Sequence, residues 1–159
     1  MGSLPVLTLS DGTRITQSDA IARWAAKKAG NAPADPDDAL LSDELSNTAF
    51  DMLNKCPQDA DEEVKKEKRQ EFAAGFLTQA CNLVCERLAI KDGPLLLGTE
   101  LCLGDLNLLM VSQMILDGHF DHVPASFLDA FPAILEHAKA VKETEIVKAY
   151  AAFDPTFKI

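Results

Sequence analysis

Two short stretches of this chain decide its fold: LPVL at residues 4–7 and TQSDAIARW at residues 16–24. The first begins a short apolar strand, and turn-forming side chains at residues 10–13 lead from it into a second short strand. The second has the apolar spacing of a helix, which Gly30 ends as the residue after the last helical turn. The sequence therefore predicts a β-β-α unit over residues 1–30.

The rest of the chain reads as helical. A linker rich in Pro, Ala and Asp at residues 31–36 is the best candidate for a domain boundary, and Asp35 followed by Pro36 is a strong helix start. We expect helices at residues 36–55, in a long segment from the polar stretch 57–70 to residue 88, and at residues 103–116, 132–141 and 143–153. The predicted fold class is mostly α, with an all-helical domain over residues 36–159.

Composition limits the possible partners and compartments. The 159 residues carry a net charge of −10 at pH 7, which argues against nucleic acid as a partner because phosphate backbones repel such a chain. We expect no membrane span, since no run of 18 apolar residues is present. The start also lacks the pattern of a secretory signal. The four cysteines form no C-x-x-C pair, so we expect reduced, mostly buried thiols and a cytoplasmic location.

Pro5 lies inside a strand-like run, where it cannot donate a ladder hydrogen bond. It therefore belongs at a strand edge, at a strand start or after a cis peptide bond, and the trans edge-strand alternative remains open. If the bond is cis, the backbone of Leu4 turns outward. Its N–H and C=O then offer strand-like hydrogen bonds to an extended peptide.

Gln17 and Ser18 stand where the second strand meets the helix. The free N–H groups of the first helical turn, the helix dipole and the Ser18 hydroxyl together favour a carboxylate, and the Gln17 amide adds a donor. The plainer interpretation is that Ser18 only caps the helix. Beside a backbone clamp at Leu4 and Pro5, however, the pair predicts a small pocket for an anionic ligand.

Other polar residues are weaker candidates. His119 and His122, with Asp117 and Asp121, could ligate a metal, but their loop setting favours solvated side chains. We expect His137 at the surface of a bundle helix. The acidic cluster at residues 59–63 lacks calcium-loop spacing, and the charge run at residues 61–69 predicts a solvated helix half.

The stretch from Leu4-Pro5-Val6-Leu7 to Gln17-Ser18-x-Ala20-Ile21-x-Arg23-Trp24 resembles the last two strands and third helix of the thioredoxin-like domain of cytosolic glutathione S-transferases. It is most similar to the sigma, alpha, mu and pi group. Further segments resemble the helical domain of that family: residues 95–98, 104–108, 131–135 and 146–150. The resemblance implies that Gln17 and Ser18 grip the γ-glutamyl carboxylate of glutathione, and that Leu4 and Pro5 hold its cysteinyl backbone.

The chain also departs from the family's pattern. The first strand, first helix and second strand have no counterpart in these residues, nor has the Tyr, Ser or Cys that activates the glutathione thiol. Ser3 replaces a Lys or Gln that often touches the ligand, and Asn47 stands where the partner subunit commonly supplies an Asp. Cys102 replaces the hydroxyl that caps the buried helix, at a cost of about 1 kcal/mol.

Two hypotheses follow from the resemblance and its departures. In the first, the protein conjugates the glutathione thiolate to hydrophobic electrophiles when the N-terminal segment is present. In the second, it is a non-catalytic interaction or scaffold subunit of a larger assembly. In either case the two-stranded unit has an unpaired edge, so we expect a homodimer or a covering partner protein.

Overall fold

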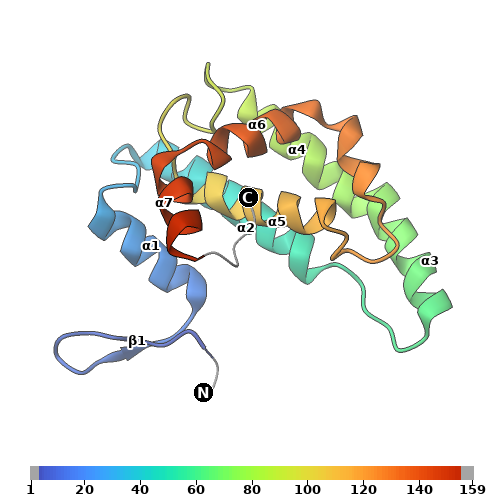
Figure 1. The fold of residues 1–159 in the computed structure, drawn as a ribbon, viewed down its shortest axis with the longest axis horizontal. Coiled ribbons are helices and arrows are strands. Elements are labelled where there is room, and N and C mark those ends of the chain that lie inside the picture. The colour runs from blue at the N-terminus through green and yellow to red at the C-terminus, as the bar shows by residue number, and fades with distance from the viewer. Residues whose placement is uncertain (1–3, 155–159) are drawn as a thin grey trace.

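The computed structural model describes residues 4–154, so Ser3 and the expectation attached to it lie outside the described residues. The chain begins with two short strands, β1 (Leu7–Thr8) and β2 (Arg14–Ile15), which pair antiparallel with Leu7 opposite Ile15. Helix α1 (Ser18–Ala29) follows and ends at Gly30, whose φ of 77° is the left-handed conformation that glycine adopts without strain. This β-β-α unit lies at one end of the molecule (Figure 1).

Helix α2 (Pro36–Asn54) starts as expected, because the Asp35 carboxylate accepts hydrogen bonds from the backbone N–H groups of Asp37 and Asp38. The long predicted helix is divided into α3 (Glu62–Phe72), a π-helical turn η1 (Ala73–Leu77) and α4 (Thr78–Leu88). The π-turn was not predicted.

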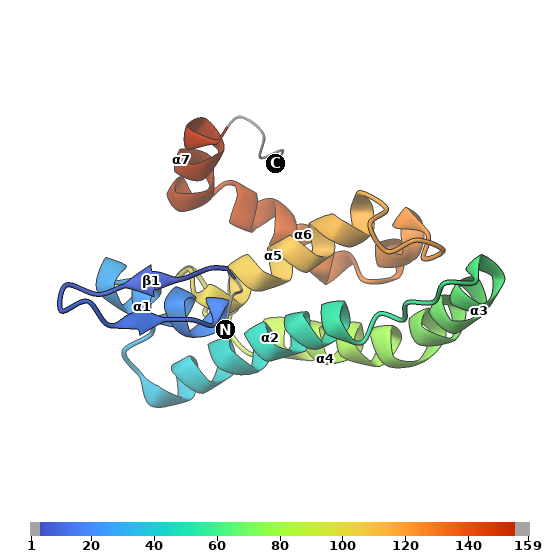
Figure 2. The same cartoon turned by 90° about the horizontal axis from the view of Figure 1, so that it is seen from below.

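The second half of the bundle consists of α5 (Leu103–Leu116), a 3-10 turn η2 (Ala125–Ala130), α6 (Pro132–Lys142) and α7 (Glu145–Phe153). Helix α5 packs against both α2 and α6, so the mostly apolar segment predicted to be central occupies the centre of the bundle. Figure 2 shows α1 and the hairpin at one end of the bundle and α3 at the opposite end. Within residues 4–154, no helix is long and apolar enough to cross a membrane.

The predicted fold class is confirmed: a partial thioredoxin-like β-β-α unit precedes an all-helical bundle. The main core joins apolar side chains of α2, η1, α4, α5 and the η2 region, among them Leu45, Leu77, Leu108 and Leu128. A smaller cluster, which includes Leu109 and Val141, joins α5 to α6 and α7.

Two expectations about polar side chains are wrong. His137 is 2% exposed rather than at the surface, because its Nε2–H donates to Asp105 Oδ1 at 2.7 Å inside the bundle. Arg69 is the last residue of the charge run 61–69, which was expected to be solvated, but its exposed fraction is also 2%. Its guanidinium donates to the carbonyl oxygens of Pro57 at 2.8 Å and Asp121 at 3.1 Å, and so joins two loops.

Candidate functional site

The Leu4–Pro5 peptide bond is cis, which removes the trans alternative. Leu4 is 89% exposed, so the backbone before β1 is open to solvent. Because Leu7 pairs with Ile15, continuing the same register brings Leu4 and Pro5 to the end of the hairpin where the chain enters α1. The two halves of the predicted clamp, Leu4 with Pro5 and Gln17 with Ser18, therefore lie at one end of the hairpin.

Gln17, not Ser18, is the capping residue of α1, so the N-cap interpretation of Ser18 is wrong. Gln17 has φ 79° and ψ 106°, a backbone conformation that residues other than glycine seldom adopt, and no side-chain capping bond is formed there. Ser18 is the first helical residue and is exposed. The first N–H groups of a helix have no intrahelical acceptor, so this end of α1 keeps donors for an external acceptor.

An ion-pair cluster that was not predicted lies one turn further along α1. The Arg23 guanidinium binds the Asp19 carboxylate through Nη1, and its Nε donates to Asp43 Oδ1 of α2 at 2.8 Å. The hydrogen bond to Asp43 is the main reason that the pKa of Arg23 is raised. The i, i+4 spacing of Asp19 and Arg23 could have predicted their ion pair from the sequence. The contact with Asp43 could not be predicted in this way, because Asp43 belongs to α2.

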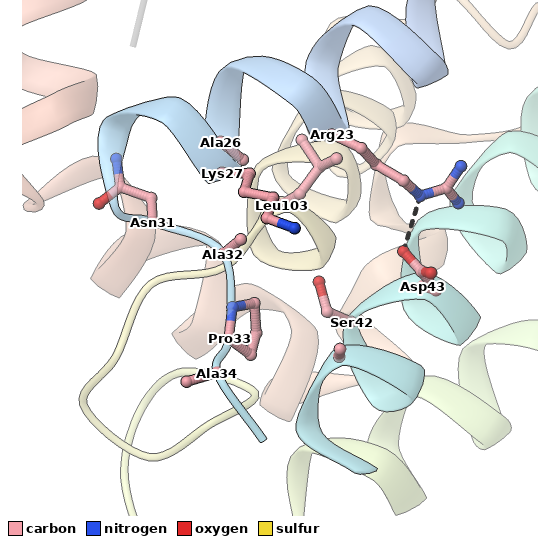
Figure 3. A pocket seen from close by; sticks show the side chains of 11 residues that line it. Arg23, Ala26, Lys27, Asn31, Ala32, Pro33, Ala34, Ser42, Asp43 and Leu103 are labelled. Carbon is pink, nitrogen blue, oxygen red and sulfur yellow. Dashed lines mark hydrogen bonds and ion pairs between the residues drawn. The ribbon is translucent and has the colours of Figure 1, made fainter. Parts of the chain in front are cut away.

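Two grooves flank α1. One, of about 440 Å³, is bounded by α1, residues 31–34, α2 and Leu103, and Figure 3 shows the Arg23–Asp43 pair at its edge. The other, of about 270 Å³, is almost entirely apolar and lies between the alanines of α1, the start of α5 and Ile146 of α7. Neither groove is lined by the four predicted clamp residues, which lie at the end of the hairpin where the chain enters α1.

Burial raises the pKa of all four cysteine thiols, which disfavours the nucleophilic thiolate. Cys81 and Cys102 are buried, and burial is the main reason that the pKa of each thiol is raised, to about 12. Cys102 is the capping residue of α5, as expected, and its backbone N–H donates to Asp105 at 2.9 Å. Asn47 is exposed on α2.

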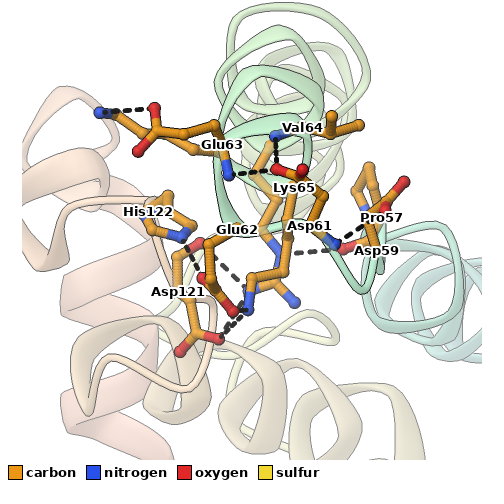
Figure 4. A network of polar contacts seen from close by, with 11 residues as sticks. Pro57, Asp59, Asp61, Glu62, Glu63, Val64, Lys65, Asp121 and His122 are labelled. Atoms are coloured by element: carbon orange, nitrogen blue, oxygen red, sulfur yellow. Dashed lines mark hydrogen bonds and ion pairs between the residues drawn. The ribbon is translucent and has the colours of Figure 1, made fainter.

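His122 belongs to a polar network at the far end of the bundle (Figure 4). His122, with φ 64°, lies 3.2 Å from Glu62 through Nε2, while Lys65 contacts both Glu62 and Asp121. In residues 4–154, no three His, Cys, Asp or Glu side chains gather in a way that could hold a metal ion. The network connects the start of α3 to the loop after α5, and we assign it a structural role.

Comparisons with known proteins agree with this architecture. Residues 48–154 match the family model described as "Glutathione S-transferase, C-terminal domain". A "Glutathione S-transferase" of Anopheles gambiae is 28% identical over 170 residues, which cover 100% of this chain and 77% of that protein.

Several solved structures are similar over 99% of the chain, and two of them illustrate the match. Rat hPGDS complexed with a quinoline gives a TM-score of 0.79 over 76% of its own chain, and its 18% identity shows the fold alone. Monomeric Na-GST-3, a glutathione S-transferase from the hookworm Necator americanus, gives 0.78 over 77% of its chain at 25% identity.

Proposed function

The chain belongs to the glutathione S-transferase family, and on that premise we propose that its β-β-α unit binds glutathione. Gln17 and Ser18 grip the γ-glutamyl carboxylate, and the backbone at Leu4 and Pro5 holds the cysteinyl residue. The observation that carries the proposal is the common position of these four residues at one end of the hairpin.

The chemistry of the helix start supports an anionic ligand. Gln17 precedes the free N–H groups of the first turn of α1, and the positive end of the helix dipole faces the same place. A carboxylate that accepts from such N–H groups replaces water as their partner. Because Gln17 forms no capping bond, its amide is available to the ligand.

The reaction we propose is conjugation of glutathione to a hydrophobic electrophile, with the helical domain supplying the surface for that second substrate. The thiolate sulfur attacks an electrophilic carbon, a carbon–sulfur bond forms, and the leaving group departs with the bonding electron pair. A free thiol has a pKa of about 8.5, so the reaction also needs a hydrogen-bond donor to the sulfur. None of the four clamp residues is that donor.

The finer organisation is part of the proposal. We assign residues 1–30 to the glutathione-binding unit and residues 36–159 to the helical domain, and we expect a second copy or a partner protein to cover the unpaired edge of the hairpin. The four free cysteines fit a reducing compartment such as the cytoplasm.

Calorimetric titration of glutathione into the chain tests the proposal, with Gln17→Ala as the diagnostic variant. We expect saturable binding that weakens by about tenfold or more in Gln17→Ala, since a ligand carboxylate loses a charge-assisted hydrogen bond. Gln70→Ala, an identical change at an exposed position on α3, is the matched control and should bind as the unaltered chain does. Absence of binding to the unaltered chain would refute the proposal and favour an interaction subunit instead.

A further inference from the structure

We propose that Arg23 is a positioning residue for the glutathione site: it neutralises Asp19, and so keeps the N-terminus of α1 able to accept the γ-glutamyl carboxylate. This inference rests on the proposed function. It assigns a role to an ion-pair cluster that lies outside the four clamp residues.

The contacts of Asp19 depend on a single cation. One of its oxygens, Oδ2, binds Arg23, while the other, Oδ1, is buried and has no hydrogen-bond partner among residues 4–154. Asp19 directly follows Ser18 in the sequence, so its carboxylate belongs to the first turn of α1. Without Arg23, a partly buried negative charge would stand beside the N–H groups that we assign to the ligand.

No other cation of α1 is near enough to take over. The remaining two, Lys27 and Lys28, stand in the last turn, and a rise of 1.5 Å per residue separates them from Asp19 by roughly 12 Å along the axis. A screened charge at that distance has little effect, because the Debye length is about 8 Å at physiological ionic strength.

Asp43 fixes the guanidinium from the other side. Its Oδ1 accepts from Arg23 Nε at 2.8 Å, so the guanidinium is held between α1 and α2 rather than left free in solvent. Figure 3 shows this pair at the groove between the two helices. A fixed cation neutralises Asp19 continuously, whereas a mobile lysine would do so only part of the time.

The test uses two peptides that differ in one group. Glutathione carries the α-carboxylate of its γ-glutamyl residue, and 4-aminobutyryl-cysteinylglycine lacks only that carboxylate. Arg23→Gln should weaken glutathione binding by about tenfold, because an uncompensated Asp19 then repels the ligand carboxylate. The same variant should bind the 4-aminobutyryl peptide within about twofold of the unaltered chain, since that peptide has no carboxylate at its γ-glutamyl end for Asp19 to repel.

Three further variants make the test specific. Asp19→Asn combined with Arg23→Gln should restore most of the glutathione affinity, because the uncompensated charge in the first turn of α1 is removed and only that of Asp43 on α2 remains. Arg23→Lys keeps the charge but not the fixed contacts of the guanidinium, so it should weaken glutathione binding less than Arg23→Gln does. Lys27→Gln removes one positive charge from the same helix but leaves the cluster intact, so it controls for net charge.

The outcomes are distinguishable. Equal weakening of both peptides by Arg23→Gln, or no recovery in the Asp19→Asn/Arg23→Gln variant, overturns the inference and assigns Arg23 a general structural role. If the unaltered chain binds glutathione and Arg23→Gln binds it equally well, the inference alone fails. If the unaltered chain binds neither peptide, the proposed function fails and the inference falls with it.

Discussion

Asp105 and His137 form a fully buried polar pair that joins the start of α5 to α6. The His137 Nε2–H donates to Asp105 Oδ1 at 2.7 Å, and the backbone N–H groups of Leu96 and Cys102 donate to the same carboxylate at 2.9 Å. The Asp105 carboxylate thus connects the loop at Leu96, the start of α5 at Cys102 and helix α6 at His137. Removing one partner leaves a buried charge poorly compensated, which costs more than the pair itself contributes.

We therefore predict that His137→Ala lowers the free energy of unfolding by about 2–4 kcal/mol. His119→Ala is the matched control, because His119 is exposed, and it should change that energy by less than about 0.5 kcal/mol. Urea unfolding followed by circular dichroism at 222 nm measures both. Equal stabilities of the two variants would contradict a structural role for the buried pair.

The Asp105–His137 pair also predicts how the free energy of unfolding depends on pH. Burial raises the pKa of Asp105, but the hydrogen bonds from His137, Leu96 and Cys102 outweigh it, so the pKa lies below its ordinary value. A lowered folded-state pKa stabilises the protein above the unfolded-state pKa of about 3.9, and this stabilisation is lost as pH falls through the folded value. Over the acidic range in which carboxyl groups titrate, the stability difference between the unaltered chain and Asp105→Asn should therefore shrink as the pH falls below about 4. A difference that grew on acidification would contradict it.

The sequence reveals polar residues of this kind only in part. His137 shares the helical stripe of Ile134 and Val141, so its burial was readable from spacing, although a histidine is by itself ambiguous. Its partner lies 32 residues away, and no local pattern indicates such a contact. Arg69 is similar: its two carbonyl acceptors are 12 and 52 residues distant, so only the tertiary structure reveals why it is buried.

At the scale of helices, two glycines in similar elements have opposite surroundings. A Cβ added at Gly104 of α5 would lie 2.8 Å from the carbonyl oxygen of Ser42 and 3.1 Å from Leu45 Cβ, so the glycine allows α5 to approach α2 closely. A Cβ at Gly75, in the π-turn, would meet nothing within 4 Å.

This contrast predicts effects of opposite sign for the same substitution. Gly104→Ala should destabilise the chain by about 1–3 kcal/mol, because backbone of α2 must move to admit the methyl group. Gly75→Ala should stabilise it by about 0.5–1 kcal/mol, since alanine loses less conformational freedom than glycine in a helical segment. Thermal unfolding of the two variants decides this, and a stabilising Gly104→Ala would show that the helices separate without cost.

The helix boundaries were predictable where local chemistry sets them. Asp35 and Pro36 predict the start of α2, and Gly30 predicts the end of α1. Helix α5 also spans the predicted residues 103–116. The strands are shorter than expected because only two residues of each pair in the described hairpin. The π-turn at residues 73–77 gave no local signal beyond one glycine, and the left-handed Gln17 gave none.

Across the whole molecule, the β-β-α unit is held less firmly than the helical bundle. Helix α1 contains no fully buried residue, its alanines face an apolar groove, and the described sheet has two strands. Units with few buried contacts open at lower free energies than the core. Trp24, the single tryptophan of the chain, lies on α1 and reports this unit alone.

We therefore predict two separate unfolding transitions in urea. Trp24 fluorescence should change at a lower urea concentration than circular dichroism at 222 nm, which is dominated by the bundle helices. Coincident transitions would show instead that the two units unfold as one cooperative body. The comparison needs low protein concentration, because a second copy that covers the hairpin would stabilise the first transition.

Glutathione should shift the fluorescence transition and leave the other in place. A ligand that binds only the folded β-β-α unit stabilises it by RT ln(1 + [L]/Kd), about 2.7 kcal/mol at a hundredfold excess over Kd. The Trp24 midpoint should therefore rise with glutathione concentration, whereas Gln17→Ala should show a much smaller rise because its clamp lacks the amide donor. A rise of the same size in Gln17→Ala would mean that glutathione binds elsewhere on the chain, and an unchanged midpoint in both would mean that the hairpin end does not bind it.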